Sequence, residues 1–80
     1  MNFICPCCGF KTLSELAGYE ICPVCFWEDD GQNDSDADIV RGGPNYSLSL
    51  SQARENFKKH GSCERKHIQN VRKPKNEEIP

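Results

Sequence analysis

Two short stretches decide the fold, CPCCGF at residues 5–10 and CPVCFW at residues 22–27. Each contains Cys-Pro-x-Cys, and residues 9–21 separate the two cysteine pairs. Two residues between cysteines allow a tight turn to direct both sulfurs at one ion, and four thiolates about 2.3 Å from Zn²⁺ complete a closed tetrahedral shell. We expect one zinc ion, with iron as the alternative because tetrahedral thiolates serve both metals. The predicted ligands are Cys5, Cys8, Cys22 and Cys25.

The residues within and after each cysteine pair favour tight turns. Pro6 and Pro23 preset φ at the second turn position, and Gly9 supplies a permissive backbone where the first turn ends. Phe26 occupies the position equivalent to Gly9. We therefore expect the second turn to leave in a more extended conformation and to lay Phe26 or Trp27 against the core.

Two cysteines are left over from this pattern. Cys7 lies inside the first turn, so we expect it to point away from the metal and to behave as a small buried apolar residue. The alternatives are a reactive thiol of lowered pKa, used for redox sensing or for pairing with Cys63, and a different choice of ligands. Cys63, His60 and His67 match no metal-binding spacing, and we expect them to be exposed to solvent.

A chain of this size needs a bound metal or covalent cross-links to stabilise its fold. At 80 residues, with 36 % hydrophobic and 28 % charged residues, an apolar core alone supplies only about 3–5 kcal/mol. Six cysteines also permit a disulfide framework. However, residues 1–6 contain neither a basic nor an apolar leader, and no run approaches the roughly 20 apolar residues of a membrane span. We therefore expect a cytoplasmic, metal-bound protein without a membrane segment.

The sequence predicts a small metal-bound α+β domain. Its architecture is a zinc-ribbon or rubredoxin-like knuckle pair with short β-hairpins, followed by one C-terminal α-helix. The helix is expected over residues 49–60, where Ser49 can act as N-cap, Gln52 can complete a capping box and Gly61 can end the last turn. Leu50, Ala53 and Phe57 form its apolar stripe. The β-prone stretches are Phe3-Ile4, Phe10 to Leu13, Tyr19 to Ile21 and Phe26-Trp27.

Charge is segregated along the chain, whose net charge is −2. Residues 28–45 are rich in Asp, Asn, Gly and Pro and predict an acidic loop, in which Ile39 and Val40 are expected to pack against the ribbon. We place the domain at residues 1–62 and a basic, partly flexible tail at residues 63–80. The basic residues are Arg54, Lys58, Lys59, Arg65, Lys66, Arg72, Lys73 and Lys75.

Several blocks resemble the bacterial cysteine-rich CPCC family, whose zinc-ribbon-like members are uncharacterised. In order, they are CPCCGFKTL, YEICPVCFWEDD, GGPN, SLSQARENFKKHG and VRKP, from about Phe3 to Pro74. The resemblance implies that Cys7 belongs to the pattern and that the acidic run and one helix face form a single surface. The matching positions outside the cysteines are Glu28, Asp29, Asp30, Gly42, Gly43, Asn45, Arg54 and Asn56.

No nucleophile and base can be paired from the sequence, so we expect a non-enzymatic protein. The leading hypothesis is a zinc-stabilised module that binds another protein, as an inhibitor, an immunity-like partner or a regulator. The alternatives are a rubredoxin-like iron electron carrier and a zinc ribbon that binds nucleic acid through its basic tail, although the aromatic residues lie beside the cysteines rather than among the cations. The expected partner-binding residues are Glu28, Asp29, Asp30 and Arg54.

Overall fold

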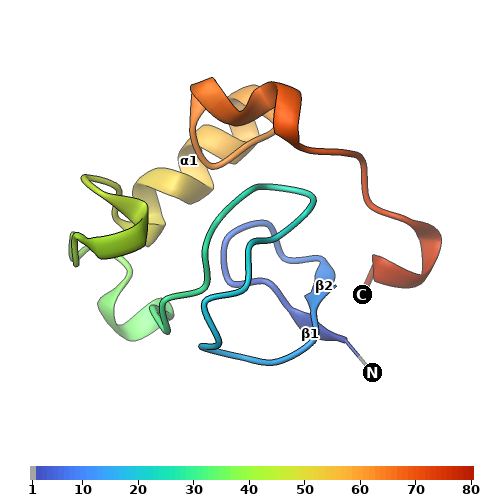
Figure 1. Ribbon diagram of the computed structural model, residues 1–80, viewed down its shortest axis with the longest axis horizontal. Helices are drawn as coiled ribbons and strands as arrows, with labels where there is room; N and C mark the ends of the chain where they lie inside the picture. Colours follow the sequence, from blue (N-terminus) through green and yellow to red (C-terminus); the bar gives the residue numbers. More distant parts are fainter. Residues whose placement is uncertain (1) are drawn as a thin grey trace.

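A short hairpin carries the first cysteine turn in the computed structural model, which describes residues 2–80 (Figure 1). Strand β1 (Phe3–Ile4) pairs antiparallel with β2 (Lys11–Leu13). Phe3 faces Leu13 across the pair, and the register is irregular between the two residues of β1. Because the turn is the connection between these strands, the hairpin fixes the directions in which Cys5 and Cys8 enter the interior.

The second predicted hairpin is reduced to a single β-bridge between Ile21 and Glu28. The expected strand over Tyr19 to Ile21 does not form, since Ala17 and Tyr19 adopt positive φ angles of 57° and 59°. Those angles lie outside the extended region that a strand requires. The backbone is nevertheless paired, because the Tyr19 amide donates to the Asp29 carbonyl at 2.9 Å.

The predicted helix is present as α1 (Leu50–His60). Ser49 is its N-cap, with Oγ accepting from the Gln52 amide at 3.0 Å. Gly61, at φ 83°, ends the helix in the left-handed conformation. The expected capping box is not completed, because the Gln52 side chain donates to Asn56 one turn later at 3.0 Å. Among residues 2–80, no helix has the length and apolarity that a bilayer crossing requires.

The interior consists of the cysteine turns together with a few apolar side chains from the hairpin and α1. Trp27 is the largest fully buried side chain, in agreement with the expectation that Phe26 or Trp27 packs inward. Sulfur therefore contributes a substantial part of the core. The buried cluster contains Cys5, Cys7, Leu13, Cys22, Val24, Cys25, Trp27, Ala37, Leu50, Ala53 and Cys63.

The acidic loop folds around a buried polar side chain. Gln32 is 2 % exposed, and its amide nitrogen donates to the carbonyls of Asp36 at 2.9 Å and Ile39 at 2.6 Å. Because this amide fills the inside of the loop, Ile39 and Val40 point outward and are 56 % and 53 % exposed. The prediction that these two residues pack against the ribbon is therefore wrong. The loop contains two 3₁₀ helices, which are η1 (Asp34–Asp36) and η2 (Gly43–Asn45).

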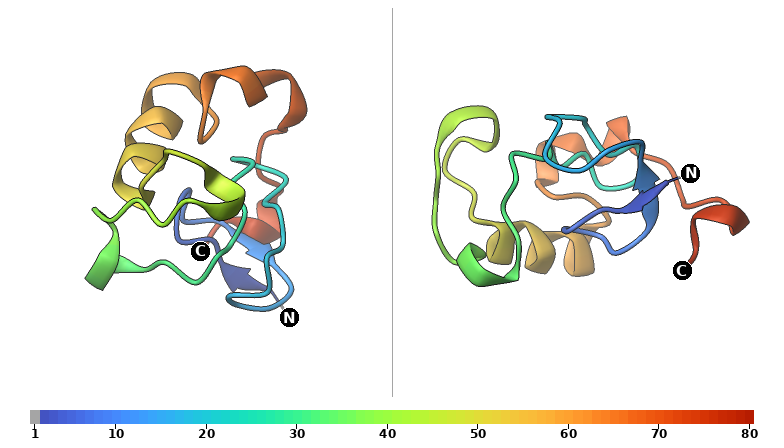
Figure 2. Two further views of the ribbon diagram at one scale, coloured as in Figure 1. Left: turned by 60° about the vertical axis from the view of Figure 1, so that its left-hand side comes forward. Right: turned by 90° about the horizontal axis from the view of Figure 1, so that it is seen from below.

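The C-terminal segment runs back across the molecule to the hairpin (Figure 2). After the 3₁₀ helix η3 (Arg65–Asn70), the Arg72 amide donates to the Pro23 carbonyl at 3.1 Å, and η4 (Asn76–Glu78) contacts β2. The buried Glu78 carboxylate accepts from both terminal nitrogens of Arg72, at 2.8 and 2.9 Å. The domain boundary after residue 62 and the partial flexibility of the tail stay predictions.

Substituting Glu78 with Gln tests whether this ion pair holds the segment. Hydrogen bonds from Arg72 and the Lys75 amide lower the pKa of Glu78 to about 2 from its ordinary 4.5. The ion pair is therefore stabilising above pH 4.5 and is lost as the pH falls toward 2. At neutral pH we expect Glu78→Gln to speed amide hydrogen exchange at Arg72 and Lys75 several-fold, on the scale of local opening. Glu77→Gln, at an exposed neighbour, is the matched control, and equal exchange rates in the two variants would contradict this role.

Candidate metal centre

The two turns bring four sulfur atoms together. The Sγ atoms of Cys5 and Cys25 are 3.7 Å apart, as are those of Cys8 and Cys22, and all four lie within 4.8 Å of one another. A tetrahedral ion with bonds of about 2.3 Å requires edges of about 3.8 Å, so the four sulfurs fit such an ion. Within residues 2–80, this is the one group of three or more Cys, His, Asp or Glu ligand atoms that lie this close. The four cysteines that the sequence singles out are therefore positioned to bind a metal ion.

The turns have the same backbone conformation although their sequences differ. The Gly9 amide donates to the Cys5 carbonyl at 2.9 Å, and the Phe26 amide donates to the Cys22 carbonyl at 2.8 Å. Phe26 has φ 71°, close to the 82° of Gly9, so the prediction of an extended exit is wrong. A left-handed conformation costs a side-chain-bearing residue roughly 1–2 kcal/mol. Stacking of Phe26 on the His67 ring, with centroids 4.2 Å apart, offsets part of this cost.

Hydrogen-bond donors surround the sulfurs of the second turn. The Val24 amide donates to Cys22 Sγ at 3.4 Å, and the Trp27 amide donates to Cys25 Sγ at 3.5 Å. The Thr12 hydroxyl lies 3.0 Å from Cys22 Sγ. Hydrogen bonds from Cys25 and the other cluster thiols, and from Thr12, lower the pKa of Cys22. The environment thus favours the thiolate at Cys22, whereas hydrogen bonding to Cys22 raises the pKa of Cys8 and Cys25, whose protons a metal ion would have to displace.

Thr12 is a residue of the candidate site that the sequence analysis missed. It lies on β2, and both Thr12 and Leu13 are buried. A polar residue in the strand that leaves the first turn is the signal that could have identified it. Thr12 thereby connects the hairpin to a ligand of the opposite turn.

The surplus cysteines are both in the interior. Cys7 is buried, as expected for a small apolar residue, whereas Cys63 is 2 % exposed and the prediction of an exposed Cys63 is wrong. The Cys63 amide donates to the Cys25 carbonyl at 2.6 Å, and Asn56 donates to the Cys63 carbonyl at 2.9 Å. Burial, together with the neighbouring Cys7, raises the pKa of Cys63 to about 12, so it stays a thiol at neutral pH. A reactive role for Cys7 stays a prediction.

The two histidines do not join Cys63 in a second metal group within residues 2–80. His60 is exposed at the end of α1, as predicted. His67 is half-buried because its ring lies against Phe26, so the prediction that His67 is exposed is wrong.

The expected acidic binding residues organise the loop from within. Asp29 and Asp30 are 2 % and 8 % exposed. Asp29 accepts from the Ala17 amide at 2.7 Å, and Asp30 accepts from the Gln32 amide at 3.0 Å. Glu28 is half-buried. The two buried carboxylates are thus committed to backbone amides and form no exposed acidic surface, and partner binding by this set stays a prediction.

Arg54 joins three parts of the chain rather than facing solvent alone. From α1, its Nε donates to the Pro6 carbonyl of the first turn at 2.9 Å, and its Nη2 pairs with Asp34 of the loop at 2.6 Å. The helix, the loop and the first turn are therefore held together by one half-buried guanidinium.

Removing a ligand should be far more damaging than removing the neighbouring surplus thiol. We expect Cys8→Ser to lose the metal and compact folding, since metal binding supplies on the order of 10 kcal/mol in comparable sites. Cys7→Ser is the matched control and should keep one metal per chain with a cooperative thermal transition. Elemental analysis and calorimetry of both variants measure this. Retention of metal by Cys8→Ser together with its loss from Cys7→Ser would show that the ligand set is wrong.

Thr12→Val should weaken the site without unfolding the protein. Loss of the hydroxyl beside Cys22 leaves all four ligands in place, so we expect metal affinity to fall by about 10-fold, as for other outer partners of metal ligands. Competition with a chromophoric chelator measures the affinity. Thr12→Ser retains a hydroxyl and should stay close to the native value. An unchanged affinity in Thr12→Val would show that this contact does not tune the site.

Comparison with known proteins agrees with this geometry. No curated protein is significantly similar to the chain. The family whose sequence pattern matches is described as cysteine-rich CPCC, and the match spans residues 3–78. It therefore includes both turns, Cys7, α1 and the segment that returns to the hairpin. Since the match covers nearly the whole described chain, this protein belongs to the cysteine-rich CPCC family.

Proposed function

We propose that this protein is a non-enzymatic module that binds another protein and whose fold is stapled by one structural zinc ion. The observation that carries the proposal is the set of four sulfurs at tetrahedral spacing, all supplied by the chain. Four thiolates leave no coordination position for water or substrate, which is the condition of a structural rather than a catalytic zinc site. The hairpin and paired turns suit a zinc-ribbon or rubredoxin-like knuckle pair.

The polar groups outside the metal centre support a non-enzymatic role. Asp29 and Asp30 accept backbone amides, and Glu78 is bound by Arg72. Among the described residues, no hydrogen bond joins a histidine to a hydroxyl or thiol, the pairing that nucleophilic catalysis uses. His67 instead stacks on Phe26.

The exposed surface supports a binding role. Many large apolar side chains remain exposed on this small domain, and these supply the kind of contact area that protein-binding surfaces use. The partner class that we propose is a protein that this module inhibits, neutralises or regulates. The exposed apolar residues are Phe3, Ile4, Leu16, Tyr19, Ile21, Ile39, Val40, Tyr46, Ile68 and Ile79.

A rubredoxin-like iron electron carrier is the second candidate. Amide donors to Cys22 and Cys25 are the kind of contact that tunes an iron–thiolate potential, and Cys8 is only half-buried. Nucleic-acid binding has weaker support. Two cations of the tail are neutralised within the chain, Arg72 by Glu78 and Lys66 by Glu64.

Purification from the native host tests the two leading candidates together. We expect a tagged chain, expressed in medium balanced in zinc and iron, to be colourless, to carry one zinc per chain and to retain a specific protein partner. Cys7→Ser should behave like the native chain, whereas Cys8→Ser should lose both the metal and the partner because the binding surface depends on the folded turns.

A red preparation with iron–thiolate absorption would favour the electron carrier. A zinc-bound chain that retains no partner beyond those of an unrelated tagged control would contradict the binding module.

A further inference from the structure

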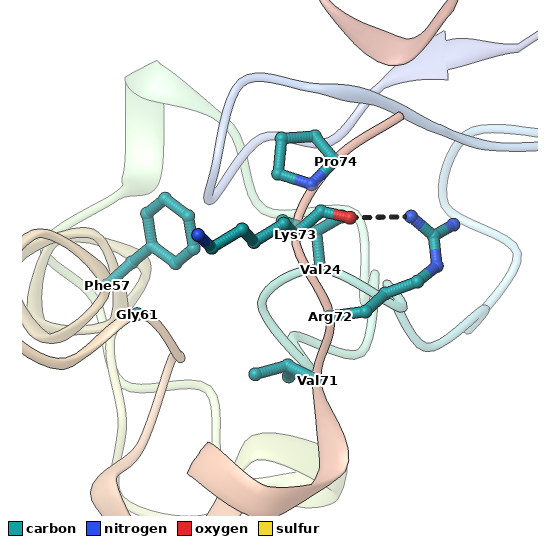
Figure 3. Close-up of a pocket in the computed structure, with 7 residues that line it drawn as sticks. All are labelled: Val24, Phe57, Gly61, Val71, Arg72, Lys73 and Pro74. Carbon is teal, nitrogen blue, oxygen red and sulfur yellow. Dashed lines mark hydrogen bonds between the residues drawn. The ribbon is translucent and has the colours of Figure 1, made fainter. Parts of the chain in front are cut away.

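A cavity of about 230 Å³ opens beside the second cysteine turn (Figure 3). Val24 contributes from the turn, Phe57 and Gly61 from the end of α1, and Val71 and Pro74 from the returning segment. The lining is therefore mainly apolar. An apolar cavity of about 150 Å³ is large enough to hold benzene, so this one has room for a single large apolar side chain.

The cavity is built from restrained elements. Val24 lies between the metal ligands Cys22 and Cys25, and its own amide bonds to Cys22 Sγ. The opposite wall is attached to the same turn, because the Arg72 amide donates to the Pro23 carbonyl at 3.1 Å. Val24 and the returning segment on the opposite wall are thus both held by the second cysteine turn.

The charge at the mouth is positive. Arg72 and Lys73 line the cavity, and no acidic residue does. The Arg72 guanidinium is occupied by Glu78, whereas Lys73 takes part in none of the ion pairs among residues 2–80. Figure 3 shows the Lys73 side chain extending in the direction of Phe57.

Two further cations belong to the last turn of α1, which also carries the lining residue Phe57. Lys58 and Lys59 are exposed, follow Phe57 directly and also form no ion pair among the described residues. Cations in a last helical turn stabilise the helix end. That explanation does not apply to Lys73, which lies outside α1.

We propose that this cavity binds one bulky apolar side chain from an acidic segment of a partner protein, whose flanking carboxylates pair with Lys73 and with the lysines at the end of α1. The inference rests on the proposed function and names the surface and the partner's chemistry. An apolar anchor supplies contact area, and the opposite charges steer the encounter and select the segment.

The same features favour a peptide over the other occupants of matching charge. Nucleic acid would use the lysines but would gain little from aliphatic walls, and the Phe57 ring already meets Phe10 edge-on at 6.4 Å. A second copy could offer Ile39 and Val40 from its acidic loop. Figure 1 shows this loop on the opposite side of the molecule from the returning segment, so a second copy would have to bind through a surface different from the one that it contacts.

Amide chemical shifts of the zinc-bound chain test the proposal with three acetylated, amidated peptides. We expect Glu-Asp-Phe-Asp-Glu to shift the amides of Val24, Gly61 and Lys73 saturably. Glu-Asp-Gly-Asp-Glu lacks the anchor and Lys-Lys-Phe-Lys-Lys reverses the charge, and each should bind at least roughly tenfold more weakly. Equal affinity of the glycine peptide, shifts confined to other residues, or no saturation at millimolar peptide would overturn the proposal.

Charge-reversed variants make the test local. Lys73→Glu should weaken the acidic peptide by roughly tenfold or more, since it places like charges together. Lys11→Glu makes the same change at an exposed position on β2 and should leave the affinity unchanged. Equal effects of the two variants would show nonspecific attraction and overturn the proposal.

Two further measurements cover the other occupants. If an octauridine shifts the same amides and binds more tightly than the peptide, the cavity is assigned to RNA and the proposal is overturned. If sedimentation shows concentration-dependent self-association that Lys73→Glu abolishes, the cavity is assigned to a second copy and the proposal is likewise overturned. Failure here is distinguishable from failure of the proposed function. A host partner retained equally by native protein and Lys73→Glu would leave the binding module standing and remove this cavity from it.

Discussion

Four cysteine sulfurs approach one another closely where the two turns meet, an arrangement that one divalent ion at their centre would stabilise. Thiolates 3.7 Å apart would otherwise repel one another in a low-dielectric interior. With the ion bound, the same sulfurs become the best-fixed points of the molecule. A chain of this length buries too little apolar surface to replace that contribution.

Segments distant in sequence attach to the two turns through single hydrogen bonds rather than through extended sheets. Arg54 reaches the first turn at Pro6, and Thr12 reaches the second at Cys22. Cys63 and Arg72 donate backbone amides to carbonyls of the second turn. The helix, hairpin and returning segment therefore share one support, and the arrangement explains why so little regular strand is needed.

Features set by near neighbours could be predicted from the sequence, and features set by distant contacts could not. The cysteine spacing identified the four sulfurs that the fold brings together, and Ser49 and Gly61 marked the ends of α1 correctly. The positive φ of Phe26 was missed because it depends on the turn repeating the geometry of the first, not on residue preference. The burial of Cys63 likewise follows from the hydrogen bond that its amide donates to the Cys25 carbonyl. The outward placement of Ile39 follows from the hydrogen bond that its carbonyl accepts from the Gln32 side chain.

Two carbonyls of the second turn accept amides from the chain after α1, that of Pro23 from Arg72 and that of Cys25, a predicted ligand, from Cys63. Without the proposed ion, the turn would no longer hold those carbonyls at fixed positions, so both hydrogen bonds would be lost together. The last portion of the chain would then become unfolded polypeptide of the kind that proteases cut first. On the proposed function, the lifetime of this protein in a cell would therefore depend on the supply of the metal.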